Sequence, residues 1–150
     1  MAIHSDLEFY VVIGKAVSKA IGEVIEKIFK ELQSSIESDI YGAYSPEDYS
    51  RTMGLLDSWR HEVRGLFGEL EFEPSMLASD PAGFHHNSPY GWDVRDQIID
   101  ILEGGYRAYN AKKGKSIPSR PMWNEFMSKV NTNFDRWMRT ALRMQGLAVI

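Results

Sequence analysis

One long run of apolar residues at helical spacing constrains the fold of this chain more than any other feature. The run follows a candidate capping box, Ser5 with Glu8, in which each side chain can bond to the backbone N–H of the other residue. Small or apolar residues then recur at alternating steps of three and four: Leu7, Tyr10, Gly14, Val17, Ile21, Val24 and Ile28. Leu32 and Ile36 extend the same face. This period predicts one helix over about residues 5–39, with roughly thirty residues covering about 45 Å. Gly14 and Gly22 would weaken such a helix, and close approach of another backbone would account for them.

A helix of this length exceeds what one small core needs. It favours packing against another copy of the chain, or bridging between layers of an assembly; a long helix folded along its own domain is the alternative. The 150 residues are 43% hydrophobic, which is enough for one core, so we expect a single domain over 1–150.

The composition also excludes several classes of protein. The chain has no cysteine, so it can form neither disulfides nor cysteine-ligated metal sites, which fits a reducing interior such as bacterial cytoplasm. No stretch approaches the roughly 18 uninterrupted apolar residues of a membrane span, and the first residues do not resemble a signal peptide. We therefore expect a soluble, unsecreted protein.

The formal charge of -4 conceals a strong asymmetry along the chain. Residues 1–104 carry 19 acidic and 8 basic side chains, a balance of -11, whereas residues 105–150 carry 2 acidic and 9 basic ones, a balance of +7. The basic end indicates nucleic acid, an acidic partner, or simply the acidic remainder of the same protein.

Residues 41–58 separate the long helix from the mixed structure that follows. Ser45 can cap a helix, Pro46 suits its first position, and Asp48 can close a capping box. Gly54 is free to adopt a positive φ before an apolar pair leads back to the core. These features predict a structural elbow and not a ligand site, with an ordinary interhelical turn as the simpler interpretation.

The order of residues in this elbow resembles a known family. A Tyr-x-x-Tyr-x-Pro-x-x-Tyr-x-Arg pattern followed by Gly-Leu-Leu-Asp is present as Tyr41, Tyr44, Pro46, Tyr49, Arg51, Gly54, Leu55, Leu56 and Asp57. The chain thereby resembles the tail-completion, or head-to-tail joining, proteins of long-tailed bacteriophages and prophages. A looser similarity covers Ser88 to Pro121, whereas Arg60 to Phe84 follows no pattern of that family.

The resemblance implies both a fold and a function. The fold would be α+β, with a long N-terminal helix, a small antiparallel β-ribbon or sheet, and two further C-terminal helices. The function would be that of a structural virion protein in the phage neck: a homo-oligomeric ring, six-fold, that joins the capsid connector to the tail tube and lets DNA pass. The connector and tail-tube proteins would be its partners, and assembly would take place in the host bacterial cytoplasm.

Two segments after the elbow have strand-like composition, within a mixed region over residues 59–78. Trp59 to Arg64 and Leu66 to Glu73 are short and rich in β-formers, and Leu70 and Phe72 alternate with glutamates. This alternation predicts an antiparallel ribbon with one face in water. A helix continuing from Leu55 to Val63 is the alternative.

The remainder of the chain is predicted to be a loop over 79–90 and a helical part over 91–146. Trp92 to Glu103 has a helical period that stops at two glycines, and Tyr106 to Ser116 is predicted to be an exposed, lysine-rich loop. The final amphipathic helix is predicted to close near Gly146, and its apolar face is formed by Met122, Phe126, Val130, Phe134, Trp137, Met138, Ala141 and Leu142.

The sequence contains no catalytic constellation. It lacks a nucleophile elbow, a phosphate-binding loop and a His-Glu-x-x-His zinc motif. His85 and His86 are adjacent and lack a spaced third ligand, and Asp96 with Asp100 fits a solvated helix face better than an acid–base pair. We expect no enzyme activity, no cofactor and no metal.

The sequence is therefore compatible with two functions, a ring-forming structural protein and a nucleic-acid-binding protein. In a cyclic ring one face of the protomer must complement a different face of the next, and opposite charges could supply such a pair. The candidate protomer interface consists of Glu69, Glu71, Glu73, Arg136, Arg139 and Arg143. The alternative is a small nucleic-acid-binding protein that uses the basic C-terminal segment, including Lys112, Lys113 and Lys115, together with nearby aromatic side chains.

Overall fold

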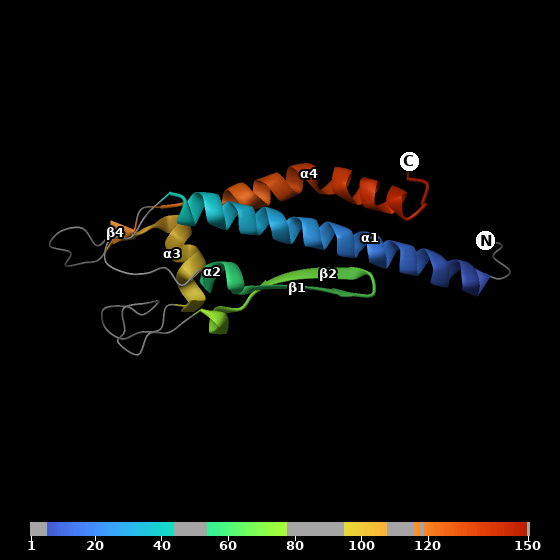
Figure 1. Ribbon diagram of the computed structural model, residues 1–150, viewed down its shortest axis with the longest axis horizontal. Helices are drawn as coiled ribbons and strands as arrows, with labels where there is room; N and C mark the ends of the chain where they lie inside the picture. The colour runs from blue at the N-terminus through green and yellow to red at the C-terminus, as the bar shows by residue number, and fades with distance from the viewer. Residues whose placement is uncertain (1–5, 44–53, 78–94, 108–115, 118, 150) are drawn as a thin grey trace. The chain divides into compact units, whose positions relative to one another are not determined.

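The structure is a computed structural model that describes residues 6–43, 54–77, 95–107, 116–117 and 119–149 (Figure 1). Its α-helices are α1 (Asp6–Ser35), α2 (Gly54–Asp57), α3 (Ile98–Gly104) and α4 (Met122–Met144). A π-helix, η1 (Ile36–Tyr41), continues α1, and two 3-10 turns are η2 (Pro74–Met76) and η3 (Arg95–Gln97). The strands are β1 (Trp59–Arg64), β2 (Phe67–Phe72), β3 (Tyr106–Arg107) and β4 (Ser116–Ile117). The predicted α+β class is confirmed.

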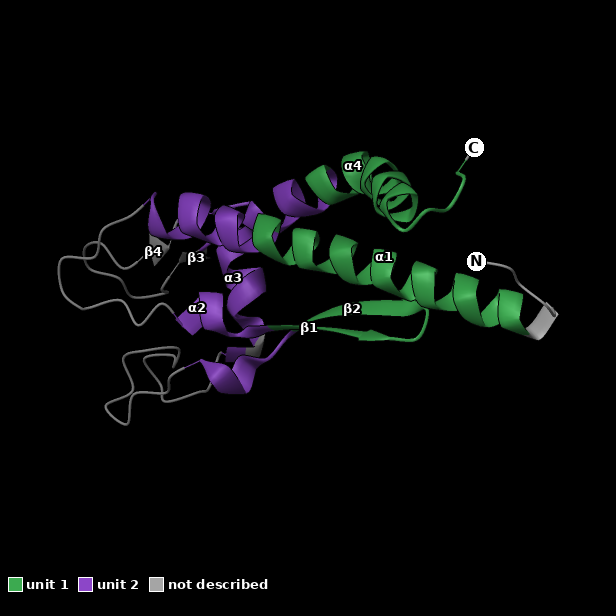
Figure 2. Cartoon of the chain, turned by 45° about the vertical axis from the view of Figure 1, so that its right-hand side comes forward, with its two compact units in different colours: residues 1–31, 60–71, 129–150 green, residues 32–59, 72–128 purple. Residues whose placement is uncertain are grey.

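The chain divides into two compact units, which Figure 2 distinguishes by colour. Unit 1 comprises residues 1–31, 60–71 and 129–150, and unit 2 comprises residues 32–59 and 72–128. The long helix α1 and the last helix α4 each contribute residues to both units.

The long helix is present where the apolar period predicted it. Its apolar stripe is buried only from Ala20 onward, because residues 8–19 contain no buried side chain. Tyr10, which the period assigned to the same stripe, is 71% exposed. The part of the stripe that belongs to unit 2 is buried, since Leu32 and Ile36 are both completely buried.

The predicted ribbon is a β-hairpin. Strands β1 and β2 are neighbours in a two-stranded sheet, and they are joined by a turn in which Gly65 has a φ of 61°. The alternative helix from Leu55 to Val63 is wrong, because α2 ends at Asp57 and the chain is extended from Trp59.

Unit 1 is built around α1, which meets the hairpin on one face and α4 on another. On the hairpin side, a Cβ placed on Gly68 would lie 2.9 Å from Ile21 Cγ2 and 3.3 Å from Ile25 Cγ1, so the strand backbone approaches the helix closely. On the α4 side, Lys27 Nζ lies 5.1 Å from the centroid of the Trp137 ring. The buried apolar side chains of this unit are Ala20, Val24, Ile28, Val130, Trp137 and Ala141.

The glycines expected to mark close backbone approach in α1 do not do so. A Cβ on Gly14 would have no described atom within 4 Å, and one on Gly22 would only touch Val63 Cγ2 at 4.0 Å. The close approach occurs instead at Gly68, in strand β2, which packs against α1.

Unit 2 has an aromatic centre and a helix end held by one carboxylate. The Trp59 and Trp123 rings stack at 5.4 Å between centroids, and Phe72 packs on Trp59 at 5.0 Å. The Glu103 carboxylate accepts hydrogen bonds from the backbone N–H of Trp123 and from Asn124 Nδ2, the latter at 2.6 Å.

One part of the C-terminal prediction is corrected. The ends of the segment expected to be a loop, Tyr106 to Ser116, are extended and paired: Tyr106 lies opposite Ile117 and Arg107 opposite Ser116, antiparallel. Gly105, with a φ of 74°, turns the chain out of α3, and Tyr and Ile are good strand formers. The predicted loop 79–90 and residues 108–115 lie outside the described residues.

Candidate functional site

The exposed apolar side chains are concentrated in unit 1. Among the described residues, every large hydrophobic side chain exposed to solvent belongs to this unit, with the single exception of Met76. They are Phe9, Tyr10, Val11, Val12, Leu66, Phe67, Phe134 and Met144. Such grouping is typical of a surface that another molecule covers.

The first of two apolar patches lies at the start of α1, and we call it the helix patch: Phe9, Tyr10, Val11 and Val12. Four successive apolar residues cover all sides of a helix, so no one face of this segment can be turned inward to hide them. The Phe9 and Tyr10 rings pack edge to face, with centroids 5.9 Å apart. This contact shields only part of Tyr10, which remains 71% exposed.

The second patch lies at the hairpin turn, and we call it the hairpin patch: Leu66 and Phe67. Phe67 is 80% exposed. It is followed at intervals of two by Glu69 and Glu71, and all three residues are exposed. Because strand side chains alternate between faces, these three lie on the face opposite Gly68, which is the face turned away from α1.

The hairpin is held to α1 by a polar contact as well as by apolar packing. His61 Nε2 lies 2.9 Å from Glu26 Oε2, and the His61 ring packs against Phe29 at 4.6 Å. Lys30 Nζ lies 3.1 Å from the other oxygen of Glu26. A hydrogen bond from Lys30, followed by weaker attraction to His61, lowers the pKa of Glu26.

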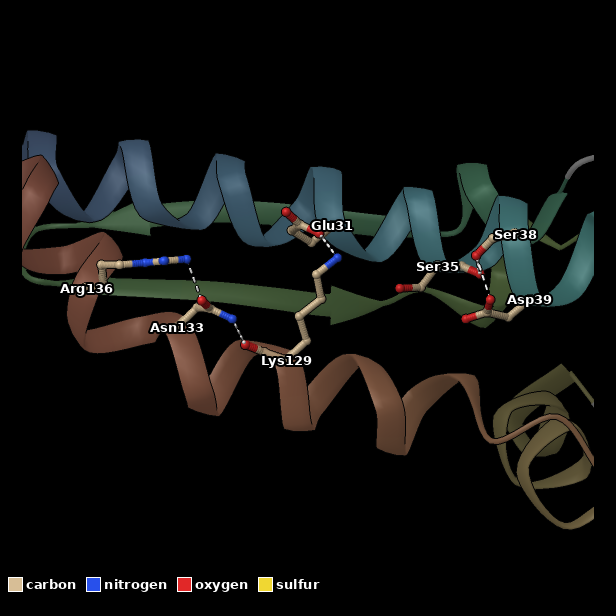
Figure 3. A network of polar contacts seen from close by, with 7 residues as sticks. All are labelled: Glu31, Ser35, Ser38, Asp39, Lys129, Asn133 and Arg136. Carbon is tan, nitrogen blue, oxygen red and sulfur yellow. Dashed lines mark hydrogen bonds and ion pairs between the residues drawn. The ribbon is translucent and has the colours of Figure 1, made fainter.

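The three candidate interface arginines of α4 already have partners on their own helix or in the tail that follows it. Arg136 donates to Asn133 Oδ1 at 2.5 Å, and Asn133 in turn donates to the Lys129 carbonyl at 2.8 Å (Figure 3). Arg139 forms an ion pair with Asp135 at 2.8 Å, whose hydrogen bond and charge raise the pKa of Arg139. Arg143 reaches the Val149 carbonyl at 3.4 Å.

The acidic half of the same candidate interface is more open. Glu69 and Glu71 are exposed, and neither carboxylate forms an ion pair or a hydrogen bond within the part of the chain that the structure describes. Glu73 is partly buried in unit 2, and its Oε1 accepts a hydrogen bond from Ser75 at 2.6 Å. The structure therefore leaves two of the three carboxylates available to a partner.

The elbow is described only at its two ends. The Tyr41 hydroxyl accepts a hydrogen bond from the backbone N–H of Leu55 at 3.2 Å, which ties η1 to the start of α2. Leu55 is buried, and the Ser58 hydroxyl donates to the Gly54 carbonyl at 2.5 Å. Nearby in unit 2, the Ser38 hydroxyl lies 2.6 Å from Asp39 Oδ1 and 3.3 Å from the Ser35 carbonyl (Figure 3). Leu56 and Asp57 lie in α2, whereas four other elbow residues lie outside the described part of the chain: Tyr44, Pro46, Tyr49 and Arg51.

Unit 1 has a recess between α1 and α4. It holds about 280 Å³ and is lined by residues that include Lys27, Trp137 and Met144. Its walls carry one acidic and two basic side chains, Glu23, Lys27 and Arg136. Lys27 lies over the Trp137 ring. Among the described residues, the buried side-chain nitrogen or oxygen without a hydrogen-bond partner is Trp59 Nε1, which does not line the recess, so no such atom defines a ligand there.

The described residues contain no group of three or more histidine, aspartate or glutamate side chains that could hold a metal ion. No helix in the same residues is long and apolar enough to cross a membrane.

The helix and hairpin patches could not be identified from the sequence as sites. Tyr10 was placed on the buried stripe, and Phe67 belonged to a segment whose pattern resembled no family. The one signal available for the hairpin patch was that Phe67 precedes Glu69 and Glu71 at intervals of two, which places its ring on the same water-facing side as the glutamates.

A family model described as YomN matches residues 5–144. No curated protein and no solved structure matches the chain.

Proposed function

We propose that this chain, which belongs to the YomN family, is a structural protein of the phage neck. The name of the family derives from a Bacillus phage or prophage. The family makes it a phage-associated protein. In the proposal, copies of the chain form a ring that joins the capsid connector to the tail tube, with DNA passing through as cargo. The protein has a geometric role, with no catalytic step and no cofactor.

One observation carries this proposal: the exposed apolar side chains gathered in unit 1. Phe67 and Tyr10 expose more than two thirds of their surface, and fully burying a side chain of this size stabilises a contact by about 1.5–3 kcal/mol. A protein that worked alone would gain nothing from leaving these groups in water. A subunit of a permanent assembly would bury them against its neighbours.

The similarity of the elbow to tail-completion proteins adds the position in the particle. The elbow residues run from Tyr41 to Asp57, and the Tyr41–Leu55 hydrogen bond supports a structural role for the first part of that pattern. A six-fold ring and contacts with the connector and tail-tube proteins follow from the resemblance, and they are part of the proposal.

The alternative, a nucleic-acid-binding protein, is less well supported by the described side chains. Trp137 is buried, and Trp123 stacks on Trp59, so these rings are engaged inside the protein. Arg136 and Arg139 have partners on their own helix. Binding of labelled single- or double-stranded DNA by the purified protein, weakened by salt, would favour this alternative.

Deleting the coding sequence from an inducible prophage tests the proposed function. We expect electron micrographs of the lysate to show filled heads and separate tails, and a plasmid copy of the gene to restore complete particles. We also expect mass spectrometry to detect the chain in purified wild-type particles. Complete, infectious particles from the deletion strain would overturn the proposal.

A further inference from the structure

We propose that the hairpin patch of one copy of this chain docks on the start of α1 of the next copy, with Glu69 and Glu71 of the hairpin facing Lys15 and Lys19 of that helix. The inference rests on the proposed function, because it specifies the contact from which the ring would be built. The occupant of each patch is thus a second copy of the same chain.

The helix side of the contact combines apolar groups with unpaired positive charge. Phe9 and Val12 are exposed, and Val12 shares a helix face with Lys15 and Lys19, which follow it by three and seven residues. Both lysines are exposed, and neither has an ion-pair or hydrogen-bond partner among the residues that the structure describes. Among the described side chains of α1 before Ala20, which are those of residues 8–19, none is buried by the chain itself.

The hairpin side is the complement in chemistry. Its outward face presents Phe67, Glu69 and Glu71 in a row, and all three are exposed. The inward face of the same strand already packs on α1 through Gly68. A two-stranded hairpin is only marginally stable in water, and covering its second face with a neighbour's helix would complete a helix–sheet–helix arrangement.

The spacings of the two surfaces match. Along β2, Glu69 and Glu71 lie about 7 and 13 Å from Phe67, at roughly 3.3 Å per residue. Along α1, Lys15 and Lys19 lie about 9 and 15 Å from Phe9, at 1.5 Å per residue. The two sets differ by about 2 Å, which is well within the reach of a flexible lysine side chain.

The end of the contact that is formed by the hairpin turn and the start of α1 also brings an acidic and a basic side chain together. Glu8 lies on the same face of α1, one turn before Val12, and Arg64 ends β1 beside the hairpin turn. Arg64 is exposed and bonds to Glu62 at 2.7 Å, and that partner, together with the charges of Glu69 and Glu71, raises the pKa of Arg64. With the strand parallel to the helix, Arg64 would approach Glu8 while the glutamates approach the lysines.

The lysines fit the glutamates better than the arginines of α4 do. Arg139 is paired with Asp135, and Arg136 with Asn133, so each would have to give up a bond that it makes within its own helix. Lys15 and Lys19 would give up none. The two patches are also different surfaces of one protomer, and a contact between different surfaces is heterologous, the type that closes into rings.

Charge reversal in two separate proteins provides the test. Variant A carries Lys15→Glu and Lys19→Glu, and variant B carries Glu69→Lys and Glu71→Lys. In variant A both surfaces are negative, and in variant B both are positive, so we expect each alone to associate at least tenfold more weakly than the wild type. In an equal mixture every contact between a copy of A and a copy of B joins opposite charges, so we expect assembly to return with the two variants alternating. Sedimentation velocity measures all three samples, and circular dichroism verifies that each variant is folded.

A cross-linking experiment locates the contact independently of charge. Because the chain has no cysteine, single variants Val12→Cys and Leu66→Cys each carry one thiol. A short bismaleimide should give a covalent dimer when the two proteins are mixed, and much less when either is used alone. The matched control replaces Val12→Cys with Phe134→Cys, another exposed apolar position, and should give little dimer with Leu66→Cys.

The outcomes separate this inference from the proposed function. A mixture of A and B that stays dissociated, A or B alone assembling like the wild type, or a wild-type protein that remains monomeric at every concentration would each overturn the contact. Free heads and tails from the deletion prophage would leave the neck function standing in all of these cases. Conversely, restored assembly in the mixture together with normal particles from the deletion strain would support the contact and overturn the neck function.

Discussion

At the scale of single residues, Glu103 shows how one side chain fixes a helix that begins 19 positions later. The first turn of a helix leaves backbone N–H groups without partners, and a carboxylate at that end satisfies them while opposing the positive end of the helix dipole. Glu103 Oε1 accepts from the N–H groups of Trp123 and Asn124, and Oε2 accepts from Asn124 Nδ2. The Ser119 hydroxyl also donates to the Glu103 carbonyl at 2.5 Å, so α3 and the start of α4 are tied together within unit 2.

We predict that Glu103→Ala destabilises the protein by about 1 kcal/mol, the typical cost of losing a helix cap. Urea denaturation followed by circular dichroism measures the change. The matched variant Glu125→Ala removes a carboxylate in the first turn of α4 that forms no hydrogen bond or ion pair within the described residues, and it should cost much less. Equal losses for both variants would show that Glu103 acts only through its charge.

A second prediction concerns acid. The hydrogen bond from Lys30 lowers the pKa of Glu26 below its ordinary value of 4.5 in the folded chain. The resulting stability is present above that ordinary value and is lost as the pH falls through the lowered one. We therefore expect the melting temperature of Glu26→Gln to fall less than that of the wild type when the pH is lowered from about 5 to about 3. Glu37→Gln, an exposed carboxylate without an ion pair among the described residues, should retain the wild-type pH dependence.

At the scale of elements, the hairpin decides how far α1 is covered. The strand backbone comes so close at Gly68 that a side chain there would meet Ile21 Cγ2 at 2.9 Å. Isoleucine is branched at Cβ and has little freedom to move aside. The contact depends on the absence of a side chain, and this explains why a glycine stands at position 68 of the strand.

The third prediction follows from this contact. Gly68→Ala should force the hairpin away from α1 and destabilise the protein by about 1–3 kcal/mol, as overpacking does. Gly14→Ala is the matched control, because the added methyl would meet nothing within 4 Å, and it should stabilise the helix by up to about 1 kcal/mol. Urea denaturation of both variants tests the opposite signs, and a stabilising Gly68→Ala would contradict the packing described.

The elements that the sequence predicted well are those with many repeats of one period. The helix over residues 6–35, the hairpin and the helix over 122–144 each repeat their pattern several times, so the local signal was sufficient. The pairing of β3 with β4 involves two residues on each strand, too few for any period to appear. The π-helical end of α1 has the same apolar spacing as an α-helix and could not be distinguished from it.

The candidate site was harder to predict, because exposure depends on which elements reach which part of a neighbour. The period placed Tyr10 on the same stripe as Val24, yet Val24 is 3% exposed and Tyr10 is 71% exposed. The difference arises from how far the hairpin and α4 extend along α1, which no local pattern contains. The ion pair of Arg139 was equally hard to predict, because the sequence does not determine whether the Asp135 side chain points toward Arg139.

At the scale of the whole molecule, the contribution of a basic side chain to assembly depends on whether it already has a partner within its own chain. The sequence indicated that Arg136, Arg139 and Arg143 could face the glutamates of a neighbour, and if they do, replacing all three by glutamate should impair assembly. Their internal partners lead us to expect a smaller effect than that of Lys15→Glu with Lys19→Glu. Sedimentation of both variants at the same concentration decides between the two basic surfaces.

The last prediction concerns the balance of apolar and charged contributions to assembly. If Phe67 is buried between copies, its transfer from water contributes about 1.5–3 kcal/mol per contact, which corresponds to a change of about 10- to 150-fold in the dissociation constant. Phe67→Ser should therefore weaken assembly at every salt concentration, whereas Met76→Ser, which alters an exposed apolar residue of unit 2, should have little effect.

Salt acts on the other component of the same contact. The screening length is about 8 Å at physiological ionic strength and 3 Å at 1 M, so the attraction between Glu69, Glu71 and the two lysines should decline over that range while the apolar burial persists. We expect wild-type assembly to weaken with salt but not to vanish, and variant A, whose charges repel, to associate more strongly as salt rises. Sedimentation velocity at both salt concentrations measures these opposite slopes. Parallel slopes for the wild type and variant A would mean that Lys15 and Lys19 do not lie in the contact, because only charges that meet across it can reverse the response to screening.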